Sequence, residues 1–72
     1  MEQDVREIFA ERLKDLRQEK GLSYLDLEEK TGISHSSLNR WENCQTDVLA
    51  YQVVKLAEYF GVSTDYLLGL EN

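Results

Sequence analysis

The chain has 72 residues, with 8 Lys or Arg against 14 Asp or Glu, a formal net charge of −6 and 42% hydrophobic residues. This length favours one domain, predicted to span residues 1–72, while the frequent hydrophobic residues argue against disorder and the single cysteine excludes an intrachain disulfide. No apolar run reaches the roughly 18–20 residues of a membrane span and no signal-peptide core follows Met1, so we expect a cytoplasmic protein with no membrane partner.

Five helices are predicted along the chain, each marked by apolar residues at helical spacing. They cover about residues 4–19, 23–30, 34–42, 48–60 and 63–69. Serines suited to N-capping precede three of them, at Ser23, Ser34 and Ser63. Glycines that suit a left-handed helix end follow three of them, at Gly21, Gly32 and Gly61. No segment alternates strictly between apolar and polar residues, so the predicted fold class is all-α, a bundle of five short helices.

The apolar faces of these helices give the expected core. In the first helix Val5 and Ile8 share an arc of about 140° with the core residues, and in the fourth Ala50 and Val54 share one of about 160°. The expected core residues are Phe9, Leu13, Leu16, Leu27, Ile33, Leu38, Trp41, Val53, Leu56, Ala57 and Phe60. Three leucines near the C-terminus, Leu67, Leu68 and Leu70, are open to two interpretations, core cover or a dimer seam.

The most informative segment is residues 21–43, GLSYLDLEEKTGISHSSLNRWEN. Two short helices flank three residues, Thr31, Gly32 and Ile33, which is typical of a sharp helix-turn-helix corner. With His35 placed at 0°, the other polar residues of the second helix fall at about 40°, 80°, 100° and 140°, in the order Asn39, Asn43, Ser36 and Arg40. A face of short hydrogen-bonding side chains with one arginine suits base edges in a DNA major groove, although exposed helix faces are polar by default.

The chain resembles the lambda repressor/Cro-type (XRE-like) helix-turn-helix family of small phage and bacterial regulators. The segments that carry the resemblance are ERLKDLRQEKGLS (11–23), EEKTGIS (28–34), LNRWEN (38–43) and KLAEYFGVSTDYLLG (55–69). It covers residues 8–70 without a gap. It implies a five-helix fold in which the second helix crosses the DNA backbone and the third enters the major groove.

Carried over position by position, the resemblance also implies the residues of a DNA site. Tyr24 would meet a phosphate, beside backbone N–H groups near Ser23 that form a natural anion site. The residues that would face bases or the adjacent backbone are His35, Ser36, Asn39 and Arg40. Those that would hold more distant phosphates are Asn43, Gln45 and Thr46. The family also pairs Arg17 with Glu42, a structural ion pair that would orient the third helix.

Four positions depart from the family pattern. Tyr24 stands where glutamine is usual, so only a hydroxyl or a ring is offered there. Glu28 replaces a small residue, which indicates an outward-reaching carboxylate or a looser corner. Cys44 replaces glycine, at a cost of roughly 1–2 kcal/mol if the backbone is left-handed. Residues 43–49 lack Lys, Arg and Pro, which predicts weaker binding and a shallower salt dependence.

The acidic balance does not exclude DNA, because the acids are spread along the chain. Residues 31–48 carry two acids, Glu42 and Asp47, against one base, Arg40. At physiological salt the screening length is about 8 Å, so carboxylates on distant helices are largely screened from the third helix. We therefore expect little long-range steering and poor non-specific affinity, with specific contacts retained.

The preferred hypothesis is a sequence-specific regulator that binds double-stranded DNA as a homodimer on a pseudo-palindromic site. No second domain follows the fifth predicted helix, so operator occlusion by a repressor is the simplest expected mechanism. The alternative is a protein-interaction module, such as an antirepressor or a regulator's partner, that has kept this fold and lost DNA binding. It is favoured by the acidic balance, Tyr24, Glu28 and the base-poor loop.

Other chemistry is not expected. Trp41 lies on the Leu38 side of its helix and is interpreted as core and not as a stacking platform. The single His and single Cys show no ligand spacing and would lie about 180° apart on a continued helix, so no metal, cofactor or catalytic dyad is predicted. No small-molecule ligand is evident, and the chain is not expected to be an enzyme.

Overall fold

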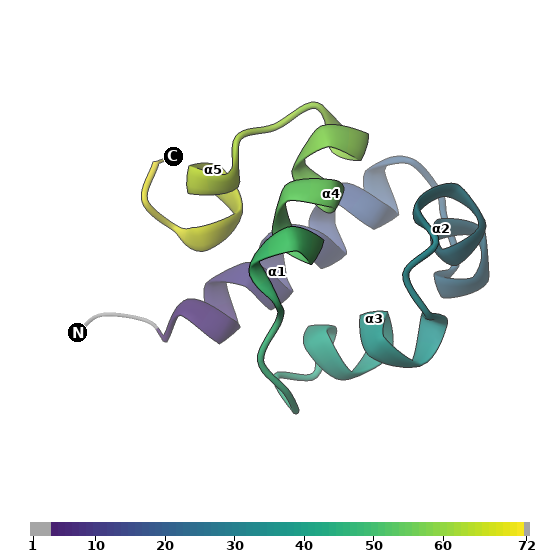
Figure 1. Ribbon diagram of the computed structural model, residues 1–72, viewed down its shortest axis with the longest axis horizontal. Helices are drawn as coiled ribbons and strands as arrows, with labels where there is room; N and C mark the ends of the chain where they lie inside the picture. The colour runs from purple at the N-terminus through teal and green to yellow at the C-terminus, as the bar shows by residue number, and fades with distance from the viewer. Residues whose placement is uncertain (1–3, 72) are drawn as a thin grey trace.

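Residues 4–71 are described in a computed structural model, and this part of the chain forms five α-helices and no strand, which confirms the predicted fold class (Figure 1). The helices are α1 (Val5–Glu19), α2 (Tyr24–Thr31), α3 (His35–Glu42), α4 (Ala50–Phe60) and α5 (Thr64–Leu68). None of these helices has both the length and the apolar character that crossing a bilayer requires.

Short polar residues begin most of the helices. Ser23, Ser34 and Ser63 are N-caps whose hydroxyl oxygens accept the backbone N–H three residues later, at 3.0, 3.2 and 2.9 Å. Asp4 caps α1 in a similar way by accepting the N–H of Arg6 at 2.7 Å. These local bonds satisfy N–H groups that a helix cannot pair internally. They explain why the predicted starts of the first, second, third and fifth helices lie within one residue of the observed ones.

The start of α4 differs from the prediction. The periodicity places it near residue 48, whereas the helix begins at Ala50 after an extended Leu49 (φ −79°, ψ 147°). The Leu49 N–H donates to the side-chain oxygen of Gln52 at 3.1 Å, which fixes this later start. The spacing of apolar residues gives no information about this side-chain bond, so the predicted helix begins two residues too early.

The core lies where the helices meet, with α1 packed on α3 and α5, α2 on α3 and α4, and α4 on α5. Its fully buried side chains are Leu13, Leu27, Leu38, Leu56 and Leu67. The rings of Phe9 and Trp41 meet edge to face with centroids 6.1 Å apart, a favoured aromatic geometry that joins α1 to α3. Ile33, Val53 and Ala57 complete the buried part of the expected core.

Several expected core positions are less buried than predicted. Leu16 and Phe60 are half-buried and pack against the core from its edge. The expected apolar faces were also too wide, because Val5 is 53% exposed, Val54 is 46% exposed and Ala50 is exposed. A domain of this size covers only part of its apolar surface, so each short helix buries a narrow stripe. In α4 that stripe consists of Val53, Leu56 and Ala57.

The C-terminal leucines have different environments. Leu67 is fully buried, which excludes it from any dimer seam, and Leu68 is half-buried against the core. Leu70 is 75% exposed. Of the three, Leu70 is therefore the one most available to a partner.

Candidate nucleic-acid interface

A three-residue turn connects α2 to α3, and a buried threonine braces it. The Thr31 hydroxyl donates to the Leu27 carbonyl at 2.8 Å and accepts the Ile33 N–H at 3.2 Å. Gly32 takes the left-handed conformation (φ 77°) and donates to the Glu28 carbonyl at 2.7 Å, so α2 ends there. The residue pattern alone does not reveal this role of Thr31. The turn is held by its own hydrogen bonds, which fixes how α3 leaves α2.

The third helix buries one side and exposes the other. Leu38 and Trp41 are buried in the core. Most of the polar residues that the sequence assigns to DNA are exposed on this helix and in the loop after it, namely His35, Ser36, Asn39, Arg40, Asn43, Gln45 and Thr46. Because the buried and exposed residues alternate at helical spacing, α3 offers solvent a continuous polar face.

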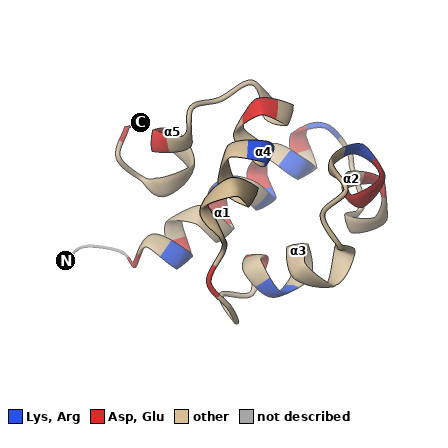
Figure 2. Ribbon diagram, in the orientation of Figure 1, with Lys and Arg blue, Asp and Glu red and all other residues tan. Residues whose placement is uncertain are grey.

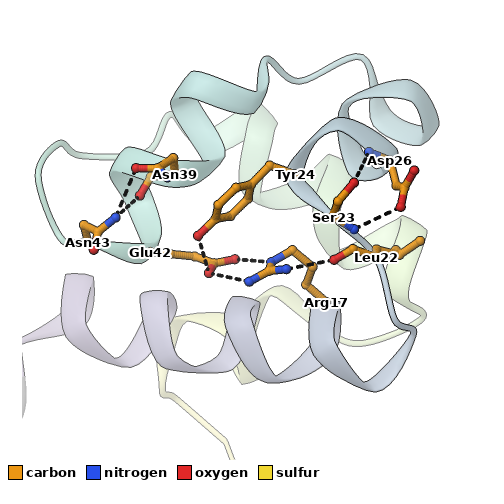
Figure 3. Close-up of polar contacts among 8 residues, drawn as sticks. All are labelled: Arg17, Leu22, Ser23, Tyr24, Asp26, Asn39, Glu42 and Asn43. Atoms are coloured by element: carbon orange, nitrogen blue, oxygen red, sulfur yellow. Dashed lines mark hydrogen bonds and ion pairs between the residues drawn. The ribbon is translucent and has the colours of Figure 1, made fainter.

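Two of these residues already interact. The side-chain amide of Asn43 donates to the backbone carbonyl of Asn39 at 2.8 Å and to its side-chain oxygen at 3.1 Å (Figure 3). A carbonyl oxygen has two lone pairs, so the Asn39 oxygen can still accept one more hydrogen bond. The arrangement restrains Asn39 on the exposed face without using up its capacity to bind an adenine edge.

Tyr24 occupies a different position from the other residues assigned to DNA. Its hydroxyl donates to Glu42 at 3.0 Å, and the Arg17 guanidinium lies 4.4 Å from the centre of its ring. Figure 3 shows the side chain pointing between α2 and α3 toward these two residues. Burial, followed by the hydrogen bond to Glu42, raises the pKa of Tyr24. A phosphate contact by this hydroxyl would require it to leave Glu42, and that contact stays a prediction.

Arg17 and Glu42 form a bidentate ion pair between α1 and α3. The guanidinium donates through Nε at 2.8 Å and through Nη2 at 3.1 Å to the two carboxylate oxygens. A third donation, from Nη1, reaches the Leu22 carbonyl at 2.8 Å. The Glu42 side chain is 3% exposed, so its charge is both paired and hidden from the α3 surface. Hydrogen bonding to Glu42 correspondingly raises the pKa of Arg17.

A second carboxylate, Glu28, touches the exposed face. One of its oxygens lies 2.7 Å from the backbone nitrogen of His35 and 2.6 Å from its Nδ1. The hydrogen bond from the backbone N–H, followed by that from the ring, lowers the pKa of Glu28. The carboxylate therefore caps the first turn of α3. We expected either an outward-reaching carboxylate or a looser corner here, whereas Glu28 forms an interhelical hydrogen bond.

The loop after α3 is left-handed at Cys44, whose φ is +57°. This is the strained alternative that the sequence raised for a side chain at the usual glycine position. Figure 2 shows α3 mostly free of charged residues, whereas α1 and α2 carry both signs. Arg40 is an exposed base on α3, and Asp47 is an exposed acid in the following loop. Glu28 adds a second acid beside His35, and the Arg6 guanidinium lies 3.7 Å from Asp47, so the two acids and two bases around this face nearly cancel.

Over residues 4–71, no group of three or more His, Cys, Asp or Glu side chains is arranged to hold a metal ion. Every buried side-chain nitrogen and oxygen of the described residues has a hydrogen-bond partner. What the surface offers is a set of hydrogen-bond donors and acceptors held by a rigid corner.

Comparison with known proteins gives two matches. A family described as helix-turn-helix matches residues 13–67. The chain is also 37% identical over 61 residues, or 85% of its length, to the HTH-type transcriptional regulator ImmR of Bacillus subtilis (strain 168). The chain spans about half the length of this curated relative, 48%. No solved structure matches significantly. Neither match is to an enzyme, in agreement with the expectation from the sequence.

Proposed function

Because the chain belongs to the helix-turn-helix family, of the Cro/C1 type, we propose that it is a transcriptional regulator that binds double-stranded DNA sequence-specifically. In this proposal α3 lies in the major groove and α2 crosses the backbone. The observation that carries this proposal is the exposed polar face of α3. The Arg17–Glu42 pair anchors α3 to α1 while leaving this face open to solvent. A DNA-binding helix must be held at a defined angle while its side chains remain accessible, and both conditions are met here.

The residues divide into two proposed roles. Base edges are read by His35, Ser36, Asn39 and Arg40, with asparagine suited to adenine and arginine to guanine. Asn43, Gln45 and Thr46 hold phosphates beyond the end of α3. The start of α2 holds another through the backbone N–H groups that remain beside the Ser23–Asp26 capping bonds. Since few of these groups are cationic, binding depends more on hydrogen bonds than on counterion release.

We further propose a homodimer on a pseudo-palindromic site. Two copies of α3 about 34 Å apart would meet successive major grooves on one side of the duplex. Exposed apolar side chains provide material for a two-fold contact, among them Leu49, Val54 and Leu70. The simplest mechanism for such a domain is repression by operator occlusion, and its place of action is the cytoplasm. Sedimentation of the free chain and of its DNA complex measures both stoichiometries.

Selection from random duplexes, repeated across a salt series starting near 50 mM, tests the proposal directly. We expect a two-fold related consensus, with Asn39→Ala and Arg40→Ala each lowering discrimination at one or two base pairs by about 1–3 kcal/mol. Lys14→Ala is the matched control, because it removes a positive charge from an exposed position on α1. If no duplex is enriched at the lowest salt concentration, the proposal is contradicted.

The second candidate function is a protein-interaction module on the same fold. The net charge of −6 and the Glu28 carboxylate beside α3 favour it. It predicts that Arg40→Ala leaves partner binding unchanged and that duplex selection fails, whereas the regulator predicts a change in base preference. The same variant therefore separates the two functions.

A further inference from the structure

Glu28 connects α2 to the first residue of α3 through a single oxygen. That oxygen accepts the His35 backbone N–H at 2.7 Å and lies 2.6 Å from the ring Nδ1. Two bonds from one residue to one oxygen hold the imidazole against the helix start. The His35 side chain nevertheless stays 54% exposed, so the ring is restrained and accessible at the same time.

The partner on Nδ1 determines which ring nitrogen carries the proton. An ionised carboxylate has no hydrogen to donate, so a bond of 2.6 Å to Nδ1 requires that Nδ1 is the protonated nitrogen. In the neutral ring, Nε2 then has only a lone pair and acts as an acceptor. Among the hydrogen bonds of residues 4–71, none involves Nε2. This nitrogen is left available to a ligand.

We propose that Glu28 is a positioning residue that sets the base preference of His35 by fixing the acceptor form of Nε2. In the major groove an acceptor pairs with an exocyclic amino group, on adenine N6 or cytosine N4. Full protonation of the ring turns Nε2 into a donor, which pairs instead with guanine O6 or N7. The inference rests on the proposed DNA-binding function and adds a specificity determinant to it.

Charged groups on three helices, α2, α3 and α4, flank this corner. Glu28 on α2 is the charged group in contact with it. Arg40 lies on the same helix, about 140° round from His35. The Lys55 ammonium of α4 lies over the turn, 3.6 Å from the place where a Gly32 side chain would begin. Of these groups, Glu28 is the one that forms a hydrogen bond with the ring, so its carboxylate fixes the position of the Nδ1 hydrogen.

The first measurement uses the free protein. His35 is the only histidine, so long-range 1H–15N spectra report its tautomer without ambiguity. At pH 8 we expect protonated Nδ1 and unprotonated Nε2 in the natural sequence. Glu28→Ala removes the acceptor and shifts part of the population to protonated Nε2, and Glu28→Gln, which keeps an amide oxygen, restores the original tautomer in part.

The second measurement is duplex selection at pH 8, where the tautomer of the free protein is also measured. The position read by His35 is the one where His35→Ala relaxes the consensus. There we expect adenine or cytosine for the natural sequence, a loss of about three- to tenfold in discrimination for Glu28→Ala, and partial rescue by Glu28→Gln. Preferences at the other positions serve as the internal control for folding.

The outcomes separate this inference from the function on which it rests. If no duplex is enriched, the proposed function fails and the inference fails with it. If a consensus emerges but the free protein carries its proton on Nε2 at pH 8, or Glu28→Ala leaves the His35 position unchanged, the inference alone is overturned.

Discussion

The Glu42 carboxylate at the end of α3 is clamped by the Arg17 guanidinium of α1 through two parallel hydrogen bonds of 2.8 and 3.1 Å. The pair joins residues 25 positions apart and is almost removed from solvent, with side-chain exposures of 13% and 3%. The C-terminal end of α3, the helix that carries the candidate recognition residues, is thus attached to α1.

Breaking this pair is expected to destabilise the fold strongly. Glu42→Gln leaves a buried guanidinium without a counter-charge and should lower the free energy of unfolding by about 3–5 kcal/mol, measured by urea denaturation. Glu29→Gln, on an exposed carboxylate of α2, is the control and should change little. The double variant Arg17→Met with Glu42→Leu should recover most of the loss, because it leaves no buried charge. Equal stability of Glu42→Gln and the natural sequence would contradict this account.

Tyr24 gives the fold a dependence on alkaline pH. The hydroxyl must keep its proton to donate to Glu42, and its pKa is raised above the ordinary value of 10.0, first by burial and then by that bond. Its contribution is therefore complete below pH 10 and is lost as the pH rises through the folded-state value. Tyr24→Phe should reduce stability at neutral pH by about 1–2 kcal/mol and should flatten the fall in stability above pH 10.

The same variant separates two roles of Tyr24. If the hydroxyl is structural, Tyr24→Phe weakens DNA binding no more than its loss of stability explains. A large loss of affinity in a fully folded Tyr24→Phe protein would instead assign the hydroxyl to a phosphate. The measurement is a binding titration at a temperature where circular dichroism shows both proteins folded.

The elements of this fold were predictable wherever the signal is local. A serine and the N–H three residues later fix the start of a helix, so Ser23 and Ser63 mark their helices in the sequence itself. The start of α4 was not predictable in this way, because the Leu49 N–H donates to the side-chain oxygen of Gln52 and the helix begins only at Ala50. The spacing of apolar residues does not predict such a bond.

The candidate site was predictable as a face but not as a set of contacts. Helical spacing places Asn39 and Arg40 on the exposed side of α3. The inward position of Tyr24 depends on a contact with a residue 18 positions away, and the Glu28–His35 bond depends on the angle between α2 and α3. These two contacts depend on how α2 and α3 are placed relative to each other, and residue spacing along one helix does not predict that placement.

Cys44 offers a stabilising substitution. Its left-handed backbone (φ +57°) costs a residue with a side chain about 1–2 kcal/mol. Glycine removes this strain, but the greater conformational freedom of glycine in the unfolded chain offsets part of the gain. Cys44→Gly should therefore raise the free energy of unfolding by about 0.5–1 kcal/mol. Cys44→Ala is the matched control, because it removes the thiol and keeps the strain. A Cys44→Gly protein no more stable than Cys44→Ala would show that strain at this position is unimportant.

Gly69 and Gly21 form a natural pair for measuring a close approach. Both are left-handed, with φ of +83° and +66°. A side chain at Gly69 would begin 2.8 Å from the Ile8 Cδ1 atom of α1, whereas at Gly21 nothing lies within 4 Å. Gly21→Ala should therefore show the backbone penalty alone, about 1 kcal/mol, and Gly69→Ala should lose that amount and about 1–3 kcal/mol more from overpacking.

Thermal and urea unfolding of the two glycine variants give this difference directly. Ile8→Val in the Gly69→Ala background provides the check, since shortening Ile8 removes the Cδ1 atom that the new methyl group would meet. Part of the loss should be recovered in that double variant, while Ile8→Val alone should cost about 0.5–1.5 kcal/mol. Equal losses for the two alanine variants would mean that α5 moves away from α1 without cost, and Gly69 would then be required only for its backbone conformation.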